Sequence, residues 1–289
     1  MKQAVYYRVQ NIAEALELAA GKDVEIIAGG TDLMVQRADR IKDPAGLLDI
    51  TGIEELRDIR FTDGDCIIGA CVTIAEIAKS DGPKIPACLR QGAQAIGSPQ
   101  IRNLATLGGN ICNGSPCGDT LAPLVSLEAE FVLRSLDGER RVKAGEFFTG
   151  PKMTVRKPGE ILTAVVLPKK CLEGISAFRM IGKREGQAIS QVNTAVWSAL
   201  DGNLRIARVR AAAGSVAPVP VRLHAAEEYL TGLGYGEIER ETLSEAVRKE
   251  IRPIDDVRAA GDYRASVTGQ LVADAVSEIF TREGGNDEA

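Results

Sequence analysis

One glycine-rich stretch, from Ala105 to Leu121, constrains the fold of this chain most strongly, and it reads ATLGGNICNGSPCGDTL. Glycine adopts backbone angles that other residues avoid, and Asn and Asp are the next most tolerant. In a loop of this kind, several backbone N–H groups can point into one concavity, which suits a phosphate. Because the stretch contains no Lys or Arg, N–H dipoles and the side chains of Thr106, Asn110 and Ser115 would have to hold the anion. A tight surface loop between two core elements is the alternative interpretation.

A second glycine turn lies nearer the N-terminus, in the segment VEIIAGGTDLM from Val24 to Met34. Its first residues are typical of a short buried strand. The strand breaks at Gly29 and Gly30, after which Thr31 is placed to cap a helix. A strand, a glycine turn and a helix start together favour phosphate binding. The third glycine of the Rossmann fingerprint and the Gly-Lys-Ser/Thr of a Walker loop are both absent. Two unlike turns in one chain therefore predict one long ligand with more than one phosphate.

Composition limits the class of protein. A length of 289 residues predicts about two domains. The net charge of −5 and the pI near 5.2 argue against nucleic acid as a partner. The N-terminal residues lack an apolar signal core, and no stretch is long enough to span a membrane. We therefore expect a cytoplasmic protein with no membrane span.

The cysteines and the single histidine offer little catalytic chemistry. Six cysteines in a chain of this length do not suggest a disulfide framework, and buried free thiols are the favoured interpretation. The Cys66–Cys71 and Cys112–Cys117 spacings occur in plant-type iron–sulfur loops, but the close third cysteine is missing. His224 lies in an expected helix away from both glycine turns, which disfavours a catalytic triad or a histidine metal site. We assign no catalytic residue and no metal ligand, a pattern that suits a protein whose cofactor performs the reaction.

Hydrophobic alternation organises the remainder of the chain. After an expected linker from Lys169 to Gly174, three strands are predicted, followed by three helices. The strands are expected at Ala177–Lys183, Gln191–Leu200 and Leu204–Ala212, and the helices at Val221–Leu230, Ile238–Glu250 and Tyr263–Phe280. A three-stranded antiparallel sheet with helices on one face fits this order.

Several segments resemble one known family. AGGTDL, IGSPQIRNLATLGGN and NGSPCGDTLAPL are similar to the FAD-binding medium subunit of the molybdenum hydroxylases, the xanthine dehydrogenase and carbon monoxide dehydrogenase flavoprotein family. FRMIGKREGQAISQVNTAVW, VRAAAGSVAPVPVRLHAAEEYLTG and DYRASVTGQLV resemble its C-terminal parts, in the same order. The resemblance implies an α+β fold with a two-subdomain FAD-binding domain of the vanillyl-alcohol oxidase and p-cresol methylhydroxylase type. The carbon monoxide dehydrogenase flavoprotein C-terminal domain would supply the three-stranded sheet. The expected bounds are 1–56 and 57–170 for the subdomains, 174–281 for the C-terminal domain and 282–289 for a flexible tail.

The resemblance also implies the cofactor and its site. One non-covalent FAD would lie between the subdomains, with both glycine turns at its pyrophosphate. The positions carried over for the first turn are Ile27, Ala28, Gly29, Gly30, Thr31, Asp32 and Leu33. Those for the second are Thr106, Gly108, Gly109, Asn110, Cys112, Asn113, Gly118 and Asp119. The Asp119 carboxylate would accept hydrogen bonds from the adenosine. Leu162 and Arg179 match positions near the flavin ring, with Lys183 and Arg184 as rival cations.

The role that the resemblance implies is electron relay. A molybdopterin-binding large subunit would oxidise the substrate, and a [2Fe–2S] small subunit would pass electrons to the FAD of this chain. NAD or another acceptor would then receive them. The substrate stays open among purines, nicotinate-like heterocycles, aldehydes and carbon monoxide. Two alternatives are a self-contained FAD-dependent oxidase of the vanillyl-alcohol oxidase type and a non-enzymatic nucleotide-binding regulator.

Overall fold

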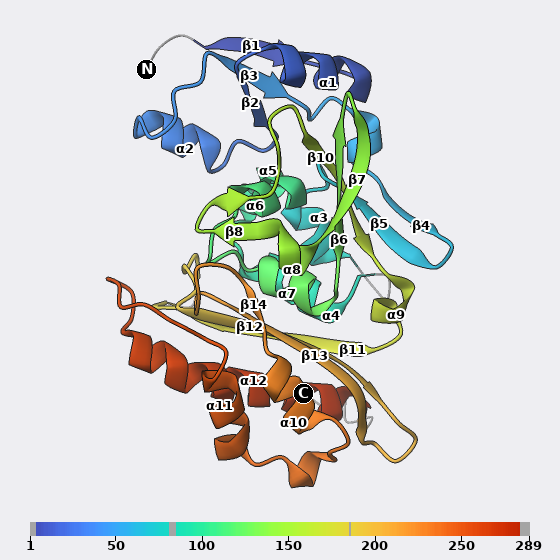
Figure 1. Ribbon diagram of the computed structural model, residues 1–289, viewed down its shortest axis with the longest axis vertical. Helices are drawn as coiled ribbons and strands as arrows, with labels where there is room; N and C mark the ends of the chain where they lie inside the picture. Colours follow the sequence, from blue (N-terminus) through green and yellow to red (C-terminus); the bar gives the residue numbers. More distant parts are fainter. Residues whose placement is uncertain (1–3, 81–84, 185, 284–289) are drawn as a thin grey trace.

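Three tiers of structure stack along the long axis of the computed structural model, which describes residues 4–80, 85–184 and 186–283 (Figure 1). The first tier is a parallel sheet in the order β1-β3-β2. Its elements are β1 (Val5–Arg8), α1 (Ile12–Gly21), β2 (Val24–Ile27), α2 (Leu33–Ala38) and β3 (Gly46–Asp49). The Asn11 side chain accepts the N–H of Glu14 at 2.9 Å and so caps the start of α1. The sequence does not predict β1, a short strand with mostly exposed residues.

The middle tier is a five-stranded antiparallel sheet in the order β4-β5-β10-β6-β7, covered by short helices. Its strands are β4 (Ile59–Thr62), β5 (Asp65–Gly69), β6 (Glu130–Ser135), β7 (Gly138–Lys143) and β10 (Ile161–Leu167). Its helices are η1 (Glu54–Leu56), α3 (Ile74–Lys79), α4 (Ala87–Ala95), α5 (Pro99–Leu104), α6 (Leu107–Asn113), α7 (Leu121–Ser126) and α8 (Ala144–Phe147). A two-stranded ribbon of β8 (Phe148–Gly150) and β9 (Met153–Thr154) lies beside them.

The C-terminal tier contains the three predicted strands and one more. The antiparallel sheet has the order β11 (Ile175–Ile181), β12 (Val192–Leu200), β13 (Ile206–Gly214) and β14 (Val221–Arg222). The helices are α10 (His224–Leu230), η2 (Tyr235–Glu237), α11 (Arg240–Arg248) and α12 (Gly261–Glu283).

Three segments differ in their type of secondary structure from the expectations drawn from the sequence. Residues 221 and 222 form β14 rather than a helix start, because their backbones pair with Ala213 and Ala212. The expected linker contains the short helix α9 (Lys169–Leu172), whose Cys171 is buried. Helix α12 runs through Glu283, so the first residues of the expected tail are helical. The remainder of that tail lies outside the described residues.

The C-terminal sheet packs against a core on each of its faces. On β12, Ala195 and Trp197 join the core of the middle tier, whereas Val192 and Val196 join the core beneath α10, α11 and α12. The buried Trp197 indole donates to the carbonyl oxygen of Cys171 at 2.9 Å. The sheet therefore belongs to both cores at once.

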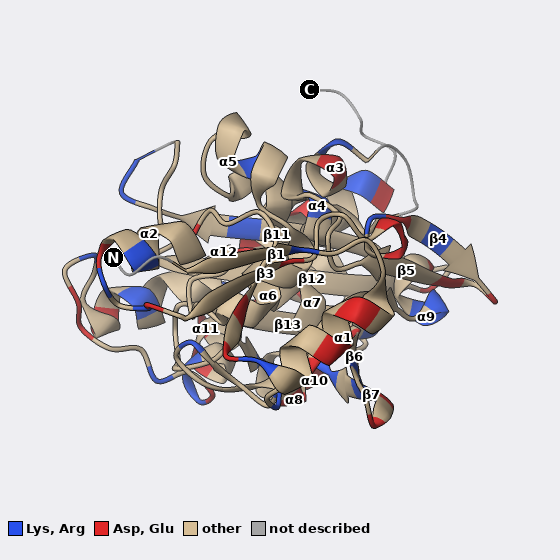
Figure 2. Cartoon of the chain, turned by 90° about the horizontal axis from the view of Figure 1, so that it is seen from above, with Lys and Arg blue, Asp and Glu red and all other residues tan. Residues whose placement is uncertain are grey.

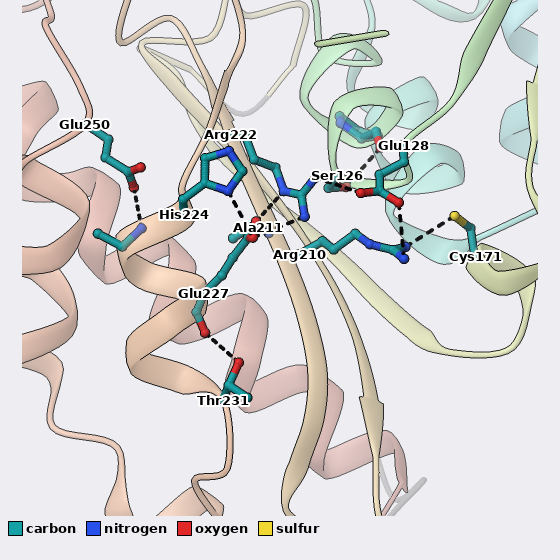
Figure 3. Close-up of polar contacts among 12 residues, drawn as sticks. Ser126, Glu128, Cys171, Arg210, Ala211, Arg222, His224, Glu227, Thr231 and Glu250 are labelled. Carbon is teal, nitrogen blue, oxygen red and sulfur yellow. Dashed lines mark hydrogen bonds and ion pairs between the residues drawn. The ribbon is translucent and has the colours of Figure 1, made fainter. Parts of the chain in front are cut away.

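An ion-pair cluster centred on Glu128 ties the middle tier to this sheet (Figure 3). Its carboxylate lies 2.5 Å from the Lys170 ammonium, 3.3 Å from the Arg210 guanidinium and 3.3 Å from the Arg222 guanidinium. Arg210 also lies with its guanidinium carbon 4.4 Å from the centre of the Trp197 ring. One carboxylate from the end of α7 thus meets cations from α9, β13 and β14.

The surface mixes charges of both signs. Lys and Arg residues are interspersed with Asp and Glu in the view from above (Figure 2). None of the helices in the described ranges has the length and apolar character that a membrane span requires.

Candidate functional site

The loop that follows β2 carries a run of unpaired backbone donors. In the described part of the chain, the N–H groups of residues 28–33 donate to no other protein group. All six residues are partly exposed, and Gly30 has a φ of +69°, in the left-handed region that favours glycine. Successive N–H groups around such a residue form a concavity with positive potential. Residues 28–33, here called the nest loop, therefore have the geometry of an anion site.

The predicted cap of α2 is wrong in detail. Asp32, not Thr31, is the residue at the N-cap position, and its side chain makes no capping hydrogen bond. Instead, the Asp32 carboxylate accepts a hydrogen bond from Gln36 and lies 3.7 Å from the Lys152 ammonium. The negative charge beside the nest loop is thereby partly compensated, and the Thr31 hydroxyl has no partner in the described residues.

Close backbone contact places the nest loop against the second glycine stretch. An added Cβ on Gly29 would lie 1.8 Å from the carbonyl oxygen of Leu104 and 2.9 Å from the nitrogen of Ala105. Only a glycine permits this approach. A weaker link of 3.5 Å joins Gln36 of α2 to Asn113 at the end of α6. The structure therefore brings the two predicted turns side by side.

The second stretch is a capped helix rather than a nest. The first N–H groups of α6 all have acceptors within the protein. These are the carbonyl oxygen of Val72 for Leu107, that of Ala70 for Gly108, the Thr106 hydroxyl for Gly109 and the Thr106 carbonyl oxygen for Asn110. The prediction of free N–H groups here is wrong, because Thr106 caps α6 and the helix start also bonds to the segment after β5. Gly108 serves packing, since an added Cβ would lie 2.7 Å from that of Ala70.

An open face of α6 lies next to the cap. Gly109 is exposed, and an added Cβ would meet only the Thr106 hydroxyl, at 2.9 Å. On the half-buried Asn110, the side-chain oxygen accepts from the Thr120 hydroxyl at 2.6 Å. The NH₂ of the same amide has no partner in the described ranges. Helix α6 thus offers room for a ligand and one side-chain donor.

The other positions carried over from this stretch support the local structure. Gly114 closes α6 with a φ of +57° and accepts the N–H of Lys152 at 2.9 Å. Burial raises the pKa of the Cys112 thiol to about 11, which keeps it protonated at neutral pH. An added Cβ on Gly118 would lie 2.9 Å from the Leu121 side chain.

Asp119 is a buried carboxylate held by the C-terminal tier. It is only 6% exposed, and its Oδ1 accepts from the Ser190 hydroxyl and, at 3.1 Å, from the Asn193 amide. Burial raises the pKa of Asp119 to about 6, although both hydrogen bonds act to lower it. Within the described residues, no cation pairs with it and Oδ2 receives no donor. One oxygen of Asp119 is therefore available to a ligand.

Three of the positions expected near the flavin ring make contacts outside the two glycine turns, and their role at the ring stays a prediction. Leu162 is buried in β10, within the core of the middle tier. Arg179 on β11 pairs with Glu278 of α12, and the Lys183 ammonium donates to the carbonyl oxygen of Val257 at 2.7 Å. No hydrogen bond or ion pair among the described residues joins Arg179 or Lys183 to the nest loop.

Two polar residues around the site were not predicted from the sequence. Thr120 contacts Asn110 from the end of the same glycine stretch, and Lys152 contacts Asp32 from a segment distant in the sequence. Thr120 directly follows Asp119, so its place in the glycine stretch was a usable signal. Nothing in the local sequence of Lys152 indicates its position, which depends on the ribbon of β8 and β9.

Comparison with known proteins agrees with this geometry. The family described as the FAD binding domain in molybdopterin dehydrogenase matches residues 2–170, and the CO dehydrogenase flavoprotein C-terminal domain matches residues 176–279. The chain is 31% identical over 287 residues to the xanthine dehydrogenase FAD-binding subunit of Escherichia coli O157:H7, covering 98% of each chain. It is 29% identical to the carbon monoxide dehydrogenase medium chain of Hydrogenophaga pseudoflava, covering 96% of this chain and 97% of that one.

A solved structure extends the likeness to three dimensions. It is a carbon monoxide dehydrogenase from Hydrogenophaga pseudoflava that lacks the Mo-pyranopterin moiety of the molybdenum cofactor. The TM-score is 0.89 at 30% identity, and the match covers 97% of this chain and 98% of that one. The fold class expected from the sequence is thereby confirmed. With an FAD-binding domain, a CO dehydrogenase flavoprotein C-terminal domain and relatives alike over their whole length, the chain belongs to the family of FAD-binding medium subunits of the molybdenum hydroxylases.

Proposed function

We propose that this chain binds one FAD non-covalently and relays electrons from a [2Fe–2S] partner subunit to NAD or another acceptor. The observation that carries the proposal is the nest loop, whose six consecutive N–H groups are free to receive the pyrophosphate. Hydrogen bonds from N–H groups to a charged acceptor are stronger than those between neutral groups. FAD, when bound, supplies the redox chemistry, for which the site itself offers no evident acid–base pair.

The residues proposed to hold FAD fall into two groups. Residues 28–33 donate backbone N–H groups, and the Thr31 hydroxyl and the Asn110 NH₂ are free to add donors. The open face at Gly109 lets the ligand approach α6, and the free oxygen of Asp119 would accept from a ribose hydroxyl or an adenine amino group. Gly108 and Gly118 act by permitting close packing rather than by touching the ligand, whereas Gly29 permits close packing and also offers its N–H group.

The proposed partners follow from the relatives. Two of them are named as medium chains of carbon monoxide dehydrogenase, and another as a medium chain of glyceraldehyde dehydrogenase. We propose for this chain a large subunit with molybdopterin and a small subunit with [2Fe–2S] clusters. A cytoplasmic location is also proposed, since all six cysteines are unpaired and thiols persist in a reducing compartment.

Acid treatment is expected to release the flavin. Burial raises the pKa of Cys112, a cysteine of α6, to about 11, and a protonated thiol is a poor nucleophile. Precipitation of the holoprotein with trichloroacetic acid should leave all yellow colour in the supernatant. Flavin retained in the washed pellet would contradict non-covalent binding.

Purification from the native host tests the relay. The tagged chain should co-purify with one molybdenum-containing and one iron–sulfur polypeptide, identified by mass spectrometry and metal analysis. Anaerobic addition of NADH to that complex should bleach the flavin and then give the electron paramagnetic resonance signal of reduced [2Fe–2S]. If the chain contains FAD but brings down neither metal, the relay is refuted while FAD binding stands. Substrate oxidation with oxygen by the isolated chain would favour the self-contained oxidase.

A further inference from the structure

Thr120 uses its hydroxyl in an unusual way for its position. It is the N-cap residue of α7, where a threonine commonly accepts an N–H from the first helical turn. Here the side chain makes no capping bond and instead contacts the Asn110 amide at 2.6 Å. Thr120 is fully buried, and within the described residues the Asn110 amide is the one polar partner of its hydroxyl.

The Thr120 hydroxyl must be the donor in this hydrogen bond, because its hydrogen needs an acceptor. If the hydroxyl accepted from the NH₂ of Asn110, its own hydrogen would be buried without an acceptor, which is unfavourable. Donation to Oδ1 satisfies that hydrogen and fixes one orientation of the amide. The NH₂ is then left as a donor on the half-buried surface of α6, beside the exposed Gly109.

We infer that Thr120 is a positioning residue that holds the NH₂ of Asn110 toward the phosphates of FAD, an inference that depends on the proposed function. Asp119, the preceding residue, is anchored to β12 and the segment before it by Asn193 and Ser190. The turn that carries Thr120 is therefore fixed from the C-terminal sheet. The orientation of one phosphate donor in the FAD domain thus depends on residues of the C-terminal tier.

The test is FAD affinity of the full-length apoprotein, measured by quenching of flavin fluorescence. Thr120→Val keeps the shape but removes the donor, so the amide can turn and Kd should rise about 5- to 20-fold. Thr120→Ser restores a hydroxyl and should stay within about 2-fold of the wild type. The matched control is Thr268→Val in α12, because Thr268 is also fully buried and donates to the carbonyl oxygen of Arg264 at 2.6 Å. This control should leave Kd unchanged.

A double-mutant cycle separates positioning from a general structural effect. Once Asn110→Ala has removed the amide, adding Thr120→Val should weaken FAD binding no further. Equal affinities of Thr120→Val and wild type, or full additivity with Asn110→Ala, would overturn the inference. If Thr120→Val does not fold, Asn110→Asp decides, since its carboxylate replaces the donor and should bind FAD more weakly than Asn110→Ala. Wild-type apoprotein that fails to bind FAD would instead refute the proposed function.

Discussion

Gly29→Ala is expected to yield soluble protein that has lost nearly all of its FAD. The new Cβ would lie 1.8 Å from the Leu104 carbonyl oxygen and 2.5 Å from its carbon, and neither is a movable side chain. The nest loop must therefore shift away from α5, which turns its free N–H groups off the pyrophosphate. Overpacking costs about 1–3 kcal/mol, and each lost hydrogen bond to a charged group costs about 1.5–3 kcal/mol. Together these predict a loss of FAD affinity of at least about 100-fold.

The measurement compares flavin content after purification with the Kd for FAD added to apoprotein. Gly21→Ala is the matched control, because Gly21 lies in the same tier and an added Cβ would meet nothing within 4 Å. It should retain wild-type affinity, and both variants should show wild-type far-ultraviolet circular dichroism. A Gly29→Ala protein that keeps full FAD would show that the nest loop is not the pyrophosphate site.

Glu128→Ala is expected to destabilise the whole protein. The substitution leaves Arg210, whose side chain is 10% exposed, and Arg222, which is 20% exposed, without their shared carboxylate. Removing one partner of a buried ion pair costs about 3–5 kcal/mol. Because a third of the Glu128 side chain is exposed and solvent screens the cluster, we expect about 2–3 kcal/mol. The melting temperature should then fall by about 4–10 °C.

The effect should depend on pH. Burial alone would raise the pKa of Glu128, but the Lys170 hydrogen bond and the Arg210 and Arg222 guanidiniums outweigh it and hold the pKa below 4.5. A carboxyl whose pKa is lowered by folding stabilises the fold fully above its unfolded value, and this contribution is lost as the pH falls through the folded value. The difference in unfolding free energy between wild type and Glu128→Gln should therefore be largest at neutral pH and shrink below 4.5.

An exposed ion pair provides the control. Glu139 lies 3.3 Å from Arg134 on the hairpin of β6 and β7, and both side chains are more than a third exposed. Glu139→Ala should change the unfolding free energy by less than about 1 kcal/mol. If Glu128→Ala and Glu139→Ala melt at the same temperature, the Glu128 cluster does not hold the tiers together.

Local signals in the sequence predicted much of the fold. The three C-terminal strands follow from the alternation of neighbouring residues, and the structure confirms them. Strands β1 and β14 were missed because each consists of only a few residues of mixed polarity, and β1 also pairs with a strand, β3, that is distant in the chain. The residues around a strand do not indicate its pairing with a strand that is distant in the sequence.

The candidate site was predicted only in part, because some of its hydrogen bonds come from segments distant in the sequence. The strand, glycine turn and helix around Gly30 are visible in the sequence, and the free N–H groups there agree with the predicted geometry. In the second stretch, the adjacent Gly108 and Gly109 suggest a loop with free N–H groups, but Thr106 and the carbonyl oxygens of Val72 and Ala70 accept these groups and form a capped helix start. The carbonyl oxygens come from a segment that no spacing rule connects to it.

The placement of the C-terminal sheet between two cores sets a limit on dissecting this protein. A cut near Gly174 would uncover Phe178, Ala195 and Trp197 on one fragment and the matching apolar layer on the other. Each fragment would expose a large hydrophobic surface, and both would aggregate more readily than the intact chain. We therefore expect that neither family region is stable as a separate polypeptide. Trp197, the sole tryptophan, lies at the interface between the C-terminal sheet and the middle tier. Its fluorescence emission would therefore report separation of the two parts without any added label.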